Sequence, residues 1–154
     1  MRIVCDTNIL VRAAVRPQGP ARAVLDAAIA DPHVLVTSGP LLAEVRRALG
    51  YERLQRLARM TAAEIDAYVE ALEGVADLVS LPSAVPAVCR DPDDDAILAT
   101  AVLGRAEVLC TLDRALRGDD VVAYCAMHGI RVLSDTELLH EWRAAGSDAA
   151  EQDA

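Results

Sequence analysis

The chain has 154 residues, 53% of them hydrophobic, and a formal net charge of −9 at pH 7. This length suits one compact domain with a sizeable core, and no apolar run approaches the roughly 20 residues needed to span a bilayer. The negative charge excludes a surface that attracts nucleic acid everywhere, because nonspecific affinity comes largely from neutralising phosphates, so any nucleic-acid site must be local. The chain contains no lysine, which excludes a P-loop and Schiff-base catalysis.

We expect that the first residues are not a secretory signal. The run from Met1 to Val4 leads straight into Asp6, so it cannot supply the charged and apolar regions that such a signal needs. The cysteines show no close pair of the kind that binds zinc or exchanges disulfides. We therefore expect a cytoplasmic protein with reduced, mostly buried thiols, at Cys5, Cys89, Cys110 and Cys125.

Short β-branched runs alternate with segments of helical periodicity along the first half of the chain. Ser38 is expected to cap a helix that Gly50 ends, and Thr61 with Glu64 predicts a capping box ahead of another helix. In chain order we expect a strand over 2–5, a helix directly after Asp6, a helix over 21–30, a strand over 34–37, a helix from Ser38 to Gly50, helices over 52–60 and 62–76, and a strand over 78–81.

The second half opens with an extended, proline-containing connection over 82–92. Ile97 and Leu98 then mark a helix that begins at Asp93 or Asp94. Strands are expected over 108–111 and 130–133, and helices over 121–128 and 137–144. The acidic, alanine-rich end, residues 146–154, is expected to be a disordered tail, which leaves one domain over residues 1–145.

Strands separated by helices predict a three-layer α/β sandwich. A central parallel sheet of about five strands would be flanked by helices on both faces, because parallel neighbours need crossover connections. In open α/β sheets, ligands bind at the carboxyl ends of the strands, beside the point where the strand order reverses. We therefore expect the functional residues at the strand ends.

Four acidic residues are predicted at this edge of the sheet. They are Asp6 after the first strand, Glu44 in the first turns after the second, Asp94 at a helix start and Asp113 after the fourth strand. Clustered carboxylates repel and raise one another's pKa unless a cation neutralises them. Hard oxygen ligands without a His or Cys set favour Mg²⁺ or Mn²⁺ over zinc.

Each of these residues also fits an ordinary structural role. Asp6 is suited to cap the following helix, and Glu44 to be a solvated acid paired with Arg47. The run Asp91–Asp95 suits a helix N-terminus, where negative charge complements the macrodipole, and Asp113 suits a turn. No member decides alone, so the joint pattern carries the interpretation.

Together these motifs resemble the PIN-domain ribonucleases, particularly the toxin components of bacterial toxin–antitoxin pairs. The resemblance covers nearly the whole chain, and its motifs stand in the family's order at suitable separations. They are Asp6–Leu10, Glu44 in the helix entered from Thr37–Ser38, Asp91–Leu98, Thr111–Asp113, and Gly129–Ser134.

The resemblance implies a PIN-like fold and metal-dependent hydrolysis of RNA phosphodiester bonds. Asp95 is the alternative to Asp94 in the ligand set, while Asn8 and Thr111 are expected to orient carboxylates or a phosphate, or to serve in a turn. A homodimer and a cognate antitoxin that blocks the acidic cleft are also implied. The implied catalytic residues and ligands for Mg²⁺ or Mn²⁺ are Asp6, Glu44, Asp94 and Asp113.

A concentration of positive charge beside Glu44 is the predicted RNA-binding or partner-binding surface. The alternative is a solvated helical face paired with Glu44, Glu52 and Glu64. The basic residues concerned are Arg46, Arg47, Arg53, Arg56 and Arg59.

Two other functions fit parts of the pattern. A phosphatase of the haloacid-dehalogenase type also begins with an Asp at a strand end, but it needs a second Asp where Asn8 stands and a later lysine, which this chain lacks. A non-catalytic PIN-like scaffold that binds RNA or a protein would retain the same acidic residues. Cleavage and metal-binding measurements separate that scaffold from an enzyme.

Overall fold

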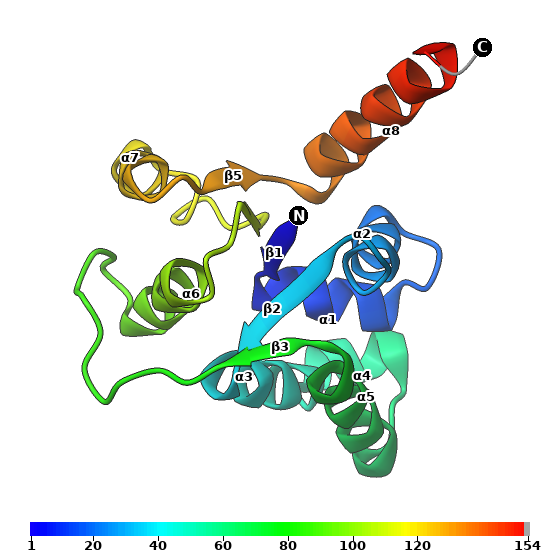
Figure 1. The fold of residues 1–154 in the computed structure, drawn as a ribbon. Coiled ribbons are helices and arrows are strands. Elements are labelled where there is room, and N and C mark those ends of the chain that lie inside the picture. Colours follow the sequence, from blue (N-terminus) through cyan, green and yellow to red (C-terminus); the bar gives the residue numbers. More distant parts are fainter. Residues whose placement is uncertain (153–154) are drawn as a thin grey trace.

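The computed structural model describes residues 1–152, and the side chains of residues 1–146. Its centre is a five-stranded sheet in the order β3-β2-β1-β4-β5 (Figure 1). Every neighbouring pair is parallel, so the predicted parallel α/β sheet is confirmed. The strands are β1 (Arg2–Cys5), β2 (Val34–Ser38), β3 (Asp77–Val79), β4 (Val108–Cys110) and β5 (Arg131–Leu133).

The strand order reverses beside β1, which lies in the middle of the sheet. On one side Val4 is in register with Val36 of β2, and on the other with Leu109 of β4. The chain therefore adds β2 and β3 on one side before it returns to add β4 and β5 on the other. This reversal is where parallel sheets bind ligands, and Asp6 and Thr111 directly follow the two strands that flank it.

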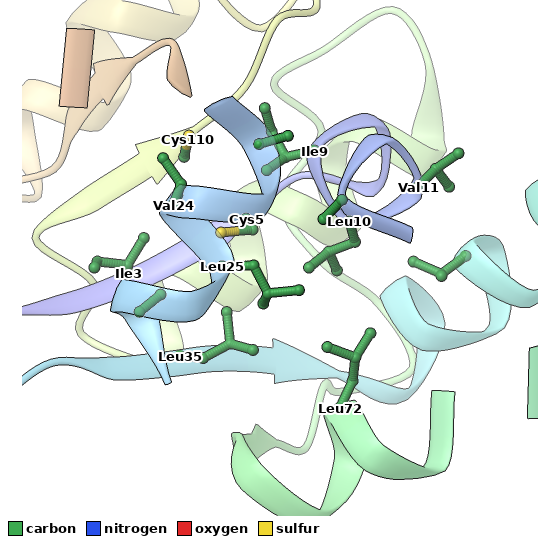
Figure 2. Close-up of a cluster of buried hydrophobic side chains, with 14 of the residues drawn as sticks. Ile3, Cys5, Ile9, Leu10, Val11, Val24, Leu25, Leu35, Leu72 and Cys110 are labelled. Atoms are coloured by element: carbon green, nitrogen blue, oxygen red, sulfur yellow. The ribbon is translucent and has the colours of Figure 1, made fainter. Parts of the chain in front are cut away.

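The alternation of side chains along the strands divides the core into two clusters. Ile3 and Leu35 point to one face, where they pack with Leu25 and other helical residues (Figure 2). Val4 and Leu109 point to the opposite face. The first cluster includes residues of α1 (Thr7–Val15), α2 (Pro20–Ala28), α3 (Gly39–Leu49), α5 (Ala62–Val75) and α8 (Asp135–Gln152), and the second includes residues of α6 (Pro92–Leu103) and α7 (Asp119–Met127).

Helices therefore cover both faces of the sheet, as the three-layer prediction requires. In Figure 1, α6 and α7 lie on one side of β1 and β2, and α1 and α2 lie on the other. A short helix, α4 (Glu52–Ala58), follows α3 and has no buried residue. Among residues 1–152, no helix is both long and apolar enough to cross a membrane.

The helix starts show which local predictions hold. The capping box is confirmed, since Glu64 N–H donates to the Thr61 hydroxyl at 3.1 Å and Thr61 N–H to the Glu64 carboxylate at 3.2 Å. Ser38 precedes α3 but makes no side-chain cap. Its buried hydroxyl instead lies 2.8 Å from the Thr100 hydroxyl of α6. Ser38 therefore occupies the predicted N-cap position, but its side chain makes no cap and instead ties the end of β2 to α6.

Several element ends differ from the prediction. The helix α6 begins at Pro92, because Asp91 rather than Asp93 or Asp94 is its N-cap, accepting from Asp93 N–H at 3.0 Å. The helix α4 ends before Arg59, whose φ of 49° is left-handed. The last helix runs to Gln152, so residues 146–152 are helical where a disordered tail was expected, and residues 153–154 lie outside the described residues.

Gly104 permits the close packing of α6 against the sheet. A Cβ atom on this residue would stand 2.7 Å from the Thr100 carbonyl oxygen and would overlap the Val36 side chain. Real Cβ atoms do not approach backbone so closely, so α6 could not end against β2 with a larger residue here.

Candidate active site

A cavity of about 620 Å³ opens at the carboxyl ends of the strands and brings together the predicted acidic residues. Its lining comes from α1, from α3 and α4, from the start of α6 and from the loop after β4. The acidic residues in the lining are Asp6, Glu44, Asp91, Asp93, Asp94 and Asp113. The four predicted ligands thus share one cavity, although they come from four separate segments of the chain.

Thr111 links Asp6 to Asp113 at the centre of this site. Its hydroxyl donates to Asp6 Oδ2 at 2.6 Å and accepts the Asp113 backbone N–H at 3.0 Å. Thr111 is fully buried and Asp6 is 4% exposed, so both hydrogen bonds are shielded from water. The bridge fixes the orientation of one carboxylate and the loop that carries the other, as expected for a residue that orients carboxylates.

Asp6 also caps α1, so the structural role predicted for it is realised at a residue that borders the cavity. Its Oδ1 accepts the Thr7 N–H at 2.6 Å, and its own N–H donates to the Cys110 carbonyl at 2.9 Å. Burial raises the pKa of the Asp6 carboxyl, the hydrogen bonds from Thr111 and Thr7 lower it, and the charge of Asp113 raises it again. The net shift is upward, so the ionised form of Asp6 is disfavoured unless a cation lies near it.

Asp94 and Asp95 are consecutive in sequence but take different roles. Asp94 lines the cavity, whereas Asp95 is 6% exposed and its Oδ1 accepts the N–H groups of Val88 and Cys89 at 2.8 and 2.7 Å. Asp95 therefore holds the 82–91 connection against α6. The placement favours Asp94 over Asp95 as the residue available to a ligand.

The half-buried carboxyl of Asp94 carries the clearest electrostatic perturbation of the site. Burial, followed by the charges of Asp113, Asp91, Asp6 and Asp93, raises its pKa to about 6. Such a shift shows that burial disfavours the ionised form of Asp94 and that repulsion from the neighbouring carboxylates adds to this effect.

Glu44 lines the cavity from α3 and forms an ion pair with Arg47 one turn further along the same helix. Its side chain is 29% exposed. The predicted alternative for Glu44, a partner for Arg47, is therefore realised in this structure, while the carboxylate still borders the same space as Asp94. The Glu44 carboxylate is therefore paired with the Arg47 guanidinium and also borders the cavity.

The predicted basic surface divides into two groups. Arg47 and Arg53 line the cavity. Arg46 instead pairs with Asp66 of α5, and Arg56 pairs with Glu52 on the exposed side of α4. Arg12 of α1 also lines the cavity, and the sequence analysis missed it, because a lone exposed arginine on a helix carries no local signal.

Asn8 lines the cavity, and one polar atom of its side chain makes no hydrogen bond to the described residues. Its side-chain oxygen is buried and has no hydrogen-bond partner among the described residues. A buried acceptor without a donor is costly in a folded protein, so it marks a place where a polar ligand or water is expected.

Metal binding by this cavity would depend on water as well as on protein. Among the side chains of residues 1–146, no three of His, Cys, Asp or Glu are grouped tightly enough to hold an ion by themselves. Mg²⁺ commonly retains several waters and takes only one or two carboxylates directly. The carboxylates of this cavity, two of which have a raised pKa, and the unpartnered Asn8 oxygen fit a hydrated ion of this kind.

The sequence of residues 2–115 matches the profile of the PIN domain. The chain belongs to the PIN-domain family. PIN domains are nucleases, and the acidic cavity is the part of this PIN domain suited to that chemistry. A comparison with curated proteins found no match.

Solved structures share the architecture of this PIN domain. VapBC-1 from nontypeable Haemophilus influenzae has a TM-score of 0.55 and 16% identity, covering 88% of this chain and 99% of that one. VapBC2 from Rickettsia felis, bound to a DNA fragment from its promoter, has a TM-score of 0.54 and 11% identity, covering 87% and 98%. At these identities the likeness establishes the fold alone.

Proposed function

We propose that this PIN domain is a metal-dependent ribonuclease that hydrolyses RNA phosphodiester bonds. The observation that carries the proposal is the convergence of Asp6, Glu44, Asp94 and Asp113 on one cavity, with Thr111 joining the first and last of them. A carboxylate cluster of this kind is unfavourable in the isolated protein, so its retention at the ligand-binding edge of the sheet favours a catalytic role over a structural one.

Asp6, Asp94 and Asp113 would hold one or two Mg²⁺ or Mn²⁺ ions, directly or through water, and Glu44 would complete the set. When bound, such an ion makes a coordinated water more acidic and neutralises charge that develops on the phosphate. The protein contributes orientation. Thr111 and the Thr7 N–H hold Asp6, and the Ala115 N–H holds Asp113 Oδ1 at 2.8 Å, which leaves the other oxygen of Asp113 available.

The decisive experiment compares three variants on a panel of RNAs in Mg²⁺, Mn²⁺ or EDTA. Asp94→Asn and Asp113→Asn should abolish cleavage. Asp95→Asn is the matched control, because it keeps an oxygen that accepts from Val88 and Cys89 and does not line the cavity. Cleavage that persists in EDTA and in the first two variants would refute the proposal. Metal binding without cleavage of any RNA would identify a non-catalytic scaffold.

We also propose that the protein is the toxin of a toxin–antitoxin pair and acts in the cytoplasm as a homodimer. The support is the motif resemblance together with the fold shared with the toxin–antitoxin complexes VapBC-1 and VapBC2. The antitoxin would cover the acidic cavity. Sedimentation of the purified chain tests the homodimer, and a monomer would contradict it. Inhibition of RNA cleavage by the small protein that a neighbouring gene encodes tests the toxin–antitoxin pair. Cleavage that no neighbouring gene product inhibits would contradict that pair.

A further inference from the structure

The cavity contains a cationic wall in addition to its carboxylates. Arg12 lies near the end of α1, six residues beyond Asp6, and Arg53 lies on α4. Six residues of helix span about 9 Å, so Arg12 stands beside the carboxylates rather than among them. The lining also includes the apolar residues Val11 and Ala48 and, next to Arg53 in the sequence, Leu54.

Arg12 and Arg53 are free to meet an external anion. Among the side chains of residues 1–146, neither has an ion-pair partner, although the chain has 24 acidic and only 15 basic residues. Arg47, the third arginine of the cavity, is already bound to Glu44. Two unpaired guanidinium groups in the lining of a cavity, in so acidic a protein, point to an anion that the protein does not itself supply.

We propose that Arg12 and Arg53 form a phosphate-binding subsite for the nucleotide next to the scissile bond. The inference rests on the proposed ribonuclease function, because RNA is the polyanion that would bring a second phosphate into the cavity. Guanidinium groups bind phosphate oxygens with two parallel hydrogen bonds. These contacts also offset the repulsion between the RNA backbone and the neighbouring carboxylates.

The subsite binds the backbone and not the base. No aromatic ring lines the cavity within the described residues, and aromatic stacking is the usual source of affinity for bases of single-stranded nucleic acid. The aliphatic surface of Val11 and Leu54 can contact any base equally. The subsite is therefore expected to accept a nucleotide with any of the four bases.

The test measures how binding of single-stranded RNA depends on salt, in EDTA so that the RNA stays intact. With an RNA of about ten nucleotides, Arg12→Gln and Arg53→Gln should each reduce the slope of log K against log salt by about 0.7, the value for one lost phosphate contact. Each should also raise KM for cleavage roughly fivefold in Mg²⁺ with kcat unchanged. Arg12→Lys should restore most of the slope, because it restores the charge.

Matched controls lie on the same two helices. Arg16, the C-cap of α1, and Arg56 of α4 are exposed and lie outside the cavity, so Arg16→Gln and Arg56→Gln remove the same charge but should leave the slope within error. Equal effects of all four changes would overturn the subsite, since general surface charge would then explain binding. Unchanged RNA binding in Arg12→Gln and Arg53→Gln would also overturn it.

The outcome separates this inference from the proposed function. If the wild-type protein cuts RNA while both cavity variants keep the wild-type salt slope and KM, the subsite is wrong and the nuclease stands. If the wild-type protein binds RNA through these arginines but cuts none under any metal condition, the arginines are an RNA phosphate site with no scissile bond beside it, and the nuclease is wrong. Melting temperatures of all variants establish that each is folded.

Discussion

Thr111 shows how a neutral side chain organises charge in this site. It carries no charge and is fully buried, yet its hydroxyl contacts Asp6 and the backbone of Asp113. A hydroxyl that donates to one group and accepts from another fixes both at once. The positions of Asp6 and Asp113 are therefore coupled, as their charges are, and a substitution of Thr111 should alter the positions of both.

Thr111→Val should lower cleavage roughly 10- to 100-fold, because it keeps the shape of the side chain but removes both hydrogen bonds of the bridge. Thr111→Ser keeps the hydroxyl and should retain most of the activity. The measurements are kcat and the Mg²⁺ concentration at half-maximal rate. Equal activity of the Val and Ser variants would show that the bridge has no part in catalysis.

Asp94→Asn should stabilise the protein in EDTA. The folded-state pKa of Asp94, about 6, lies above its ordinary value of 3.8. The associated stability is therefore present at low pH and is lost as pH rises through 6. Above that pH the variant should gain about 1 kcal/mol, after allowance for solvent screening, or roughly 2–4 °C in Tm.

The control for this change is Asp120→Asn, which removes an exposed carboxylate from the first turn of α7. It should lose a little stability, because that carboxylate complements the helix macrodipole. Thermal melts at pH 4.5 and pH 7.5 make the comparison. A gain for Asp94→Asn of equal size at both pH values would contradict the assigned electrostatics.

At the scale of elements, α6 connects the core to the site. Its first turn supplies Asp94 to the cavity, Asp95 holds the preceding loop, Thr100 contacts Ser38, and Gly104 ends the helix against Val36. Contacts at both ends fix the helix along its length. The position of Asp94 therefore depends on packing about ten residues away.

Gly104→Ala should destabilise the protein by about 1–3 kcal/mol, because the added methyl group collides with backbone and with Val36. Gly74→Ala in α5 is the matched control. A Cβ there meets no atom within 4 Å, so the change should stabilise the helix by about 0.5–1 kcal/mol. Urea denaturation measures both, and a neutral Gly104→Ala would show that α6 shifts freely against the sheet.

Element order and fold class follow from local patterns in the sequence, whereas several site details depend on distant contacts. The sequence favoured Asp94 but left Asp95 as the alternative, because consecutive helical residues face different directions and only the position of the 82–91 connection decides which one is covered. The contact that occupies the Ser38 hydroxyl could not be predicted from local sequence, because its partner Thr100 is 62 residues away. Arg12 has no neighbouring motif that marks it.

The prediction for the end of the chain differs from the structure for another reason. Its acidic composition suggested disorder, but it is also rich in alanine, the best helix former, and it continues an existing helix. Extending a helix avoids the cost of nucleation, so composition alone was a poor guide there.

At the scale of the whole molecule, the net charge of −9 opposes RNA binding and favours cation binding. Mg²⁺ at about 100 times its dissociation constant should stabilise the folded protein by about 2.7 kcal/mol, or roughly 5–10 °C in Tm. Asp113→Asn should lose most of this gain. Scanning calorimetry with Mg²⁺ and with Na⁺ at equal ionic strength separates site binding from general screening; equal shifts in the two salts would contradict a specific site.

The pairing of β1 with β4 also determines when the site can exist during synthesis. Cys5 lies beside Cys110, and the bond between Thr111 and Asp6 spans 105 residues of sequence. A growing chain that has not yet released β4 from the ribosome has Asp6 and Glu44 but neither Thr111 nor Asp113. A chain that ends before Asp113 cannot complete the acidic cavity, so under the proposed function it would not cut RNA, and a partner that covers the site would be needed only for molecules that extend past this residue.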